Sequence, residues 1–234
     1  MRQLLCDKIL GNLIGIWLLI PEHLLLGTWD LLRRWTGKHT AEVQPRIAMQ
    51  MVHEAALCLT GKRQKRTLSQ QGFELANGLP FVASDWAVHE LLDIHTVAES
   101  QAVQLMLGKL RHALGHYPGV VMAIDPHRIK SYSKRQMVSR KKDPQSPATK
   151  QLQTFFALDA DSQQPICCTL GSSSRTVSQA TPRLLQMASE ILRPHNHRPL
   201  VLADTEHYAL DLLDQVRTHS PFDLLARLSQ IFDI

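Results

Sequence analysis

Residues 120–129 read VVMAIDPHRI, a β-branched and apolar run that ends on a single carboxylate, Asp125. The pattern recurs at residues 199–208, PLVLADTEHY, where a second short apolar run leads into Asp204. Both runs are short and rich in strand-forming residues, so each predicts a buried strand. An isolated charge at the end of a buried strand is costly unless it is paired or bound to a cation. The two aspartates are therefore the first candidates for a functional site.

The segments around these two runs predict an α/β fold. Residues 154–160 and 165–171 are two further short apolar runs, joined by the turn-forming residues DSQQP. Thr181 with Pro182 predicts the start of a helix, a second helix is predicted over residues 207–219, and residues 221–228 predict the last strand. The order β-β-β-α-β-α-β implies a mixed sheet covered by helices.

The first half of the chain has a different character. Thr28 is a predicted helix cap for the segment that Gly37 ends, Pro45 is predicted to open a longer helix, and Thr96 with Glu99 forms a T-x-x-E capping box. We therefore expect a helical N-terminal region at residues 1–117 and an α/β core at residues 118–234. Residues 69–92 hold two short predicted helices, but their connection is longer than a helix-turn-helix allows, which favours plain helical packing.

The apolar N-terminus and the cysteines bear on the cellular compartment in which the protein is expected. Residues 9–20 are apolar, but the run is shorter than a membrane span and is followed by Pro21 without a cleavage site. We expect a buried or interfacial helix and a cytoplasmic protein without a transmembrane segment. A membrane-surface role through this helix is the least favoured alternative. The four cysteines, Cys6, Cys58, Cys167 and Cys168, lack metal-ligand spacing and are expected to be free thiols.

Positive charge is concentrated directly after Asp125. The whole chain of 234 residues has a net charge of +5, yet residues 126–150 alone carry eight basic side chains and one acidic one. Such a strip suits a polyanionic partner, although a solvated loop remains the alternative. The candidate phosphate-binding residues are Arg128, Lys130, Lys134, Arg135, Arg140, Lys141 and Lys142, together with Arg175 in a later loop. The cluster KRQKR at residues 62–66 has the same two interpretations.

Two carboxylates on neighbouring strands can share divalent cations. Magnesium, or manganese in its place, prefers oxygen ligands and keeps water and substrate phosphates around it, which suits phosphoryl transfer. The alternative for each residue is a turn cap, since Asp before Pro, as at Asp125, often begins a turn. The shared pattern of Asp125 and Asp204 favours a metal site for the pair.

On these residues the chain resembles the ribonuclease H-like core of DDE transposases from bacterial insertion sequences. The resemblance covers roughly residues 118–228 and rests on the strand order, on MAIDPHRI and on VLADTEHY with the aromatic Tyr208 after the second acid. It implies that Asp125 and Asp204 are catalytic metal ligands for Mg²⁺ or Mn²⁺. It further implies DNA, the terminal repeats of the element, as the partner at the bacterial nucleoid. The N-terminal helices would then serve in DNA binding or in forming a homodimer.

One feature of that family is missing from the sequence. The family places a third acid, a glutamate, on a helix beyond the fifth strand, but no glutamate follows Glu206 here. We therefore expect a transposase that is truncated before this residue and weak or inactive alone. The alternative is a non-catalytic DNA-binding protein, such as a transposition inhibitor derived from a transposase.

Overall fold

The computed structural model describes residues 14–37, 43–57, 73–132, 134, 136–141, 145 and 147–228. The chain forms two compact units, Met1–Leu107 and Gly108–Ile234. The domain boundary after residue 117 stays a prediction. Within the described residues, no helix is long and apolar enough to cross a membrane.

The first unit is helical, as predicted. Its helices are α2 (Ile14–Leu18), α3 (Ile20–Leu25), α4 (Thr28–Thr36), α5 (Val43–Ala56), α7 (Phe73–Ala76), α8 (Asp85–Asp93) and the start of α9 (Val97–Ala113). A core cluster joins α4, α5 and α8 through the buried residues Leu32, Ile47, Ala48, Met49, Leu79, Ala83, Val88 and Leu91.

The helix signals of this unit are only partly correct. The capping box is confirmed, since Glu99 N donates to Thr96 Oγ1 over 3.2 Å and Thr96 N donates to Glu99 Oε2 over 2.7 Å. The predicted cap at Thr28 is wrong, because Thr28 is already helical and its hydroxyl is bonded to His23 Nδ1 instead. The described part of residues 9–20 forms the short helices α2 and α3 rather than one helix.

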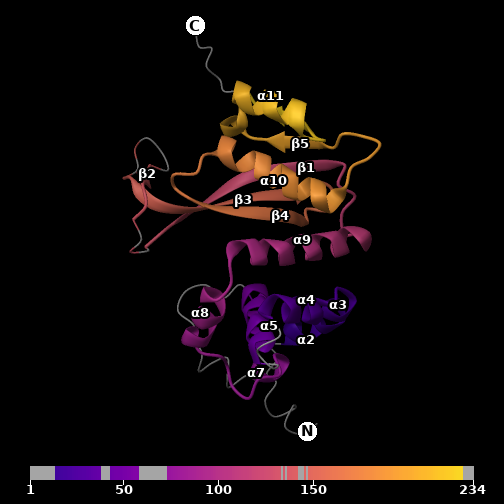
Figure 1. Cartoon of the computed structure of the whole chain (residues 1–234), viewed down its shortest axis with the longest axis vertical. Helices are drawn as coiled ribbons and strands as arrows, with labels where there is room; N and C mark the ends of the chain where they lie inside the picture. Colours follow the sequence, from indigo (N-terminus) through magenta and orange to yellow (C-terminus); the bar gives the residue numbers. More distant parts are fainter. Residues whose placement is uncertain are drawn as a thin grey trace. The chain divides into compact units, whose positions relative to one another are not determined.

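The second unit is built on a mixed sheet. Its strands are β1 (Val121–Lys130), β2 (Ser139–Arg140), β3 (Thr149–Asp159), β4 (Pro165–Ser172), β5 (Leu200–Ala203) and β6 (Asp223–Ala226). The spatial order is β4-β3-β1-β5-β6, with β2 paired to β3. β1 is antiparallel to β3 and parallel to β5, and β5 is parallel to β6. The predicted succession β-β-β-α-β-α-β is confirmed, with the two-residue β2 added (Figure 1).

Helix α10 (Val177–Leu192) packs on β3 and β4, and α11 (Leu210–His219) packs beside β6. α10 begins five residues before the predicted start, since its N-cap is Thr176 rather than Thr181. A capping box at Thr176 and Gln179 starts the helix, and Thr181 donates its hydroxyl to Val177 O over 2.8 Å. The helix start is therefore set by the capping box at Thr176, and Thr181 lies inside the helix.

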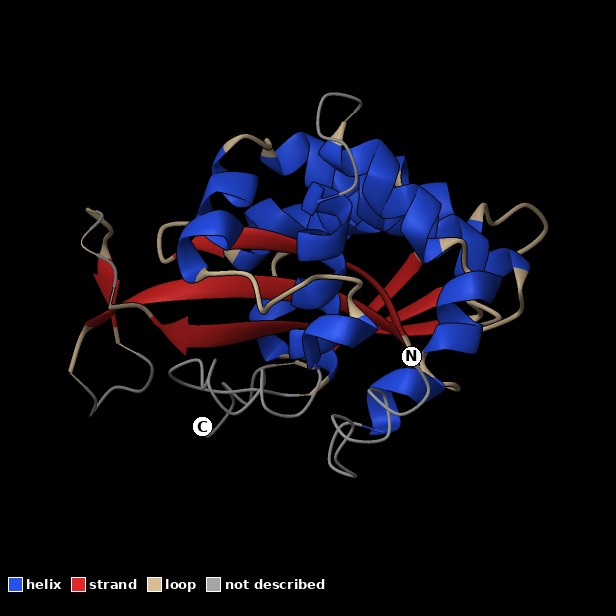
Figure 2. Cartoon of the chain, turned by 90° about the horizontal axis from the view of Figure 1, so that it is seen from below, coloured by secondary structure: helices blue, strands red, loops and turns tan. Residues whose placement is uncertain are grey.

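The long antiparallel pair β1–β3 changes the setting of Asp125. The parallel pairing of β1 with β5 ends at Ile124 and Ala203, but its pairing with β3 continues to Lys130. The predicted strand end at Asp125 is therefore wrong. Pro126 lacks an N–H and is tolerated here because β1 has a partner on one side only beyond Ile124. β1, β3 and β4 together extend past the ends of β5 and β6, toward β2 (Figure 1; strands are red in Figure 2).

Candidate functional site

The structure brings Asp125 and Asp204 together. Ile124 and Ala203 are register partners on the parallel strands β1 and β5, so the residue after each lies at the same level of the sheet. Asp125 belongs to β1, whereas Asp204 is the first residue beyond β5. The charges of the two carboxylates interact, and the negative charge of Asp204 helps to raise the pKa of Asp125.

The pKa of the Asp125 carboxyl is raised above its ordinary value. Partial burial is the main cause, because the protein excludes some of the water around a side chain that still lies at the surface, and the charge of Asp204 is the second. His207 and Arg128 act in the opposite direction. Perturbed carboxylates of this kind mark candidate functional sites, and a divalent cation would relieve the repulsion between them.

Asp204 also organises the turn that follows β5. Its Oδ1 accepts hydrogen bonds from Glu206 N (3.1 Å) and from the ring Nδ1 of His207 (2.7 Å). Both bonds close the short 3₁₀ helix η2 (Thr205–His207), for which Asp204 is the N-cap. The turn-cap interpretation therefore holds for Asp204. It is wrong for Asp125, because β1 continues through Pro126 instead of turning.

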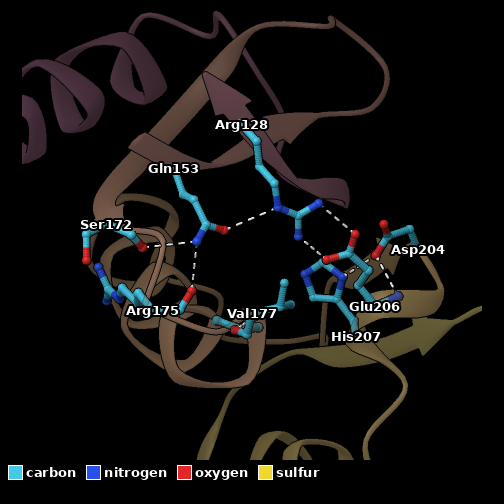
Figure 3. A network of polar contacts seen from close by, with 9 residues as sticks. Arg128, Gln153, Ser172, Arg175, Val177, Asp204, Glu206 and His207 are labelled. Carbon is cyan, nitrogen blue, oxygen red and sulfur yellow. Dashed lines mark hydrogen bonds and ion pairs between the residues drawn. The ribbon is translucent and has the colours of Figure 1, made fainter. Parts of the chain in front are cut away.

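Arg128 connects this turn to the middle of the sheet. Its guanidinium pairs with both carboxylate oxygens of Glu206, and Nη1 to Oε1 measures 2.8 Å. Its Nε donates to Gln153 Oε1 over 3.4 Å, and the Gln153 amide donates to the carbonyl oxygens of Ser172 and Arg175 (Figure 3). The ion pair with Glu206 raises the pKa of Arg128 further. The guanidinium is thus held in place beside the two aspartates.

Sequence reasoning did not single out Glu206, His207 or Gln153 as site residues. For Glu206 and His207 the available signal was their spacing from Asp204. They are the second and third residues after it, and a single turn after a strand brings such residues back to the end of the strand. Gln153 gave no such signal. It is a buried polar residue, 2% exposed, inside a strand whose partners only the sheet register supplies.

The basic strip lies mostly on the extended β1–β3 pair. Lys130 and Lys150 belong to these strands, with the Lys130 ammonium 5.2 Å from the ring centroid of the exposed Tyr132. Lys134 and Lys141 are exposed in the connection. The backbone of Arg140 lies in β2. The predicted residues Arg135 and Lys142, and the cluster at residues 62–66, lie outside the described residues.

Arg175 lies in the loop after β4. Its Nη1 donates to Leu170 O over 2.6 Å, and its guanidinium lies 5.7 Å from the Phe155 ring centroid. The side chain therefore packs against its own hairpin. The cysteines in this unit agree with their prediction, since neither Cys167 nor Cys168 forms a disulfide. Cys167 is buried, which raises the pKa of its thiol to about 12, and Cys168 is half-buried.

The two aspartates fit part of a magnesium or manganese site. They offer oxygen donors on adjacent strands, which is the ligand type these cations prefer, and water and phosphate oxygens would complete the coordination. Among the residues that the structure describes, no three His, Cys, Asp or Glu side chains are grouped to hold a metal ion. Among the described residues, the protein ligands available to a metal ion at this site are thus the two carboxylates of Asp125 and Asp204.

No family model and no curated protein matches the chain. Solved structures with a similar arrangement include the Mos1 mariner paired-end complex with Mn, which is 14% identical with a TM-score of 0.32, covering 82% of this chain and 60% of that one. A Mos1 transposase paired-end complex with the left transposon end is 16% identical, with a TM-score of 0.32 and coverage of 82% and 61%. A piggyBac transposase synaptic complex with hairpin DNA is 11% identical, with a TM-score of 0.37 and coverage of 89% and 42%.

The chain thus spans less than two thirds of the length of each of these proteins. TM-scores of this size carry no argument about function. The fold class of the second unit therefore rests on its own strand order and pairing, which form a mixed α/β sheet with the succession β-β-β-α-β-α-β, β2 aside.

Proposed function

We propose that the Gly108–Ile234 unit is the catalytic core of a DDE-type transposase, which cleaves DNA phosphodiester bonds and transfers the cut strand with the help of a divalent metal ion. One observation carries the proposal: the adjacent carboxylates of Asp125 and Asp204, at the level where the parallel pair β1–β5 ends. The raised pKa of Asp125 supports it, because the pair is poised to take up a cation.

In this proposal Asp125 and Asp204 hold the metal ion, Mg²⁺ or Mn²⁺. When bound, the ion would polarise the scissile phosphate and activate the attacking water or 3′-hydroxyl. Arg128 lies beside the pair, and its guanidinium, held in place by Glu206 and Gln153, can donate a hydrogen bond to the phosphate. The site then needs little reorganisation as charge develops on the phosphate oxygens.

The basic strip would position the DNA. Exposed lysines on the β1–β3 extension and its connection can neutralise backbone phosphates without reading the base sequence. The proposed contacts are Arg128, Lys130, Lys134, Arg135, Arg140, Lys141, Lys142 and Arg175. The partner would be the terminal repeats of a bacterial insertion sequence, engaged by a homodimer.

The proposal is tested on the full chain with Mn²⁺ and a supercoiled plasmid as substrate. Because the described donor set holds only two carboxylates, we expect weak nicking in the wild type and at least a tenfold further loss in Asp125→Asn and in Asp204→Asn. Asp214→Asn is the matched control, because that exposed carboxylate on α11 pairs only with Arg217 among the described residues. Nicking that survives both site substitutions would contradict the proposal.

The second candidate is a non-catalytic DNA-binding protein, such as a transposition inhibitor. It is favoured by the limit of two carboxylates in the described part of the site. Its signature would be DNA affinity that falls steeply with salt, together with no metal-dependent nicking and no change in affinity in Asp125→Asn. Two measurements separate the candidates: the plasmid assay and a DNA-binding titration at 50 and 200 mM salt. Between these two salt concentrations the DNA affinity of a strongly electrostatic complex falls by about a thousandfold.

A further inference from the structure

His207 is a deeply buried polar residue at the site. It is 2% exposed, whereas the side chains of Asp204 and Glu206 are 42% and 41% exposed. It lies at the end of η2, which packs against α10. A buried imidazole needs a hydrogen-bond partner, and the Asp204 carboxylate supplies it at 2.7 Å from Nδ1.

The chemistry of this pair assigns the donor. An ionised carboxylate can only accept, so the proton between the two groups belongs to Nδ1 of His207. Glu206 N donates to the same oxygen, Oδ1, over 3.1 Å. Within the described residues, Oδ2 of Asp204 is left without a hydrogen bond, and it is the oxygen available to a cation shared with Asp125.

The backbone of the turn is closed independently of the ring. His207 N donates to Asp204 O over 3.2 Å, and Ala209 N donates to His207 O over 2.9 Å. The turn therefore keeps its main-chain hydrogen bonds when the side chain at residue 207 is changed. The imidazole itself has a narrower task, the orientation of the carboxylate.

We propose that His207 is a positioning residue for the metal site: its Nδ1–H holds Oδ1 of Asp204 and thereby presents Oδ2 to the divalent cation. This inference rests on the proposed function and goes one step beyond it. Partners that hold a ligating carboxylate or imidazole in place usually change metal affinity by 10–100-fold when they are lost. A carboxylate held on one oxygen also loses less rotational freedom when the ion binds.

The test is the affinity for Mn²⁺ alone, followed by electron paramagnetic resonance of the free ion in a titration of the full chain. His207→Phe keeps a ring of similar shape without the donor, and we expect at least a tenfold weaker affinity. His207→Asn places an amide N–H near the position of Nδ1, and we expect it to recover affinity to within about threefold of the wild type. His219→Phe, at an exposed position on α11, is the control and should bind as the wild type does.

A purely structural role would affect stability and leave the affinity of the folded protein unchanged. Each variant is therefore compared at a temperature well below its own Tm. The inference is overturned if the folded Phe variant binds Mn²⁺ normally, or if the Asn variant binds as weakly as the Phe variant. ¹⁵N spectra of the wild-type histidines add a test without substitution: a His207 Nδ1 that carries no proton would overturn the inference as well.

These outcomes are distinguishable from failure of the proposed function. If Mn²⁺ affinity of the wild type does not depend on Asp204, as measured with Asp204→Asn, the proposed metal site is wrong and the role of His207 is wrong with it. If the affinity depends on Asp204 but not on His207, the metal site stands and the inference alone is overturned.

Discussion

Two aspartates on the same strand pair, Asp125 and Asp159, experience opposite environments. Asp159 is fully buried and accepts hydrogen bonds from Gly119 N (2.9 Å), Ser162 N (2.8 Å) and the Ser162 hydroxyl (2.9 Å). Burial alone would raise the pKa of Asp159, but these hydrogen bonds outweigh it and the pKa is lower than usual. The pKa of Asp125 is raised instead, by partial burial and by the charge of Asp204.

The comparison shows that the sequence pattern does not separate structural from functional carboxylates. The segment TFFALD, which ends on Asp159, is an apolar strand that leads into an aspartate, like the two segments that drew attention to Asp125 and Asp204. Asp159 is satisfied by its own turn. Among the residues that the structure describes, no hydrogen bond to Asp125 offsets the repulsion from Asp204, and a bound cation would offset it.

The largest expected effect is the loss of stability in Asp159→Ala. Removing the carboxylate leaves buried N–H and O–H groups without an acceptor, so we expect a loss of about 3 kcal/mol in the free energy of unfolding. Asp125→Ala is the matched substitution on the partner strand and should cost less than about 1 kcal/mol, because its side chain lies at the surface. Urea unfolding of both variants measures the difference, and equal losses would remove the contrast between the two sites.

A smaller loss is expected for Gly119→Ala, which acts on the same structural site through the backbone. Gly119 has a φ of +69°, and a Cβ there would lie 2.6 Å from Leu192 Cδ2. We expect a loss of about 2 kcal/mol in the free energy of unfolding, because strain and overpacking displace the Gly119 N–H, which donates a hydrogen bond to Asp159. The Mn²⁺ affinity of the folded variant should stay at the wild-type value. A parallel fall in affinity would show that the two carboxylate sites are coupled.

The smallest effect is a gain of stability in Asp125→Asn without metal. A carboxyl whose folded-state pKa is raised destabilises the fold when ionised, so the penalty appears as the pH rises from the unfolded pKa, about 3.9, through the folded value. For a surface group we expect about 0.5 kcal/mol, or 1–2 °C in Tm, at pH 7 and no gain at pH 3. Mn²⁺ should reverse the order, because it stabilises only the wild type. Thermal scans at both pH values with and without Mn²⁺ measure this, and a lower Tm of the variant at pH 7 without metal would contradict it.

Local patterns predicted elements well where short-range physics dominates. The strand succession and the capping box at Thr96 and Glu99 were correct, because apolar periodicity and cap hydrogen bonds act within a few residues. Element lengths were predicted less well. β1 extends six residues beyond Ile124 because β3 is long enough to pair with it, and nothing in residues 125–130 signals that partner.

The sequence by itself determined the α/β class, the presence of acidic residues after apolar strands and the placement of positive charge after Asp125. Only the tertiary structure decided which acids meet. The parallel register of β1 and β5 sets Asp125 beside Asp204, while two loops, one at Gly119 and one at Ser162, supply the hydrogen bonds to Asp159. The turn after β5 brought Glu206 and His207 to the site. The physical reason is that strand pairing depends on contacts between segments some eighty residues apart, and local propensity carries no record of them.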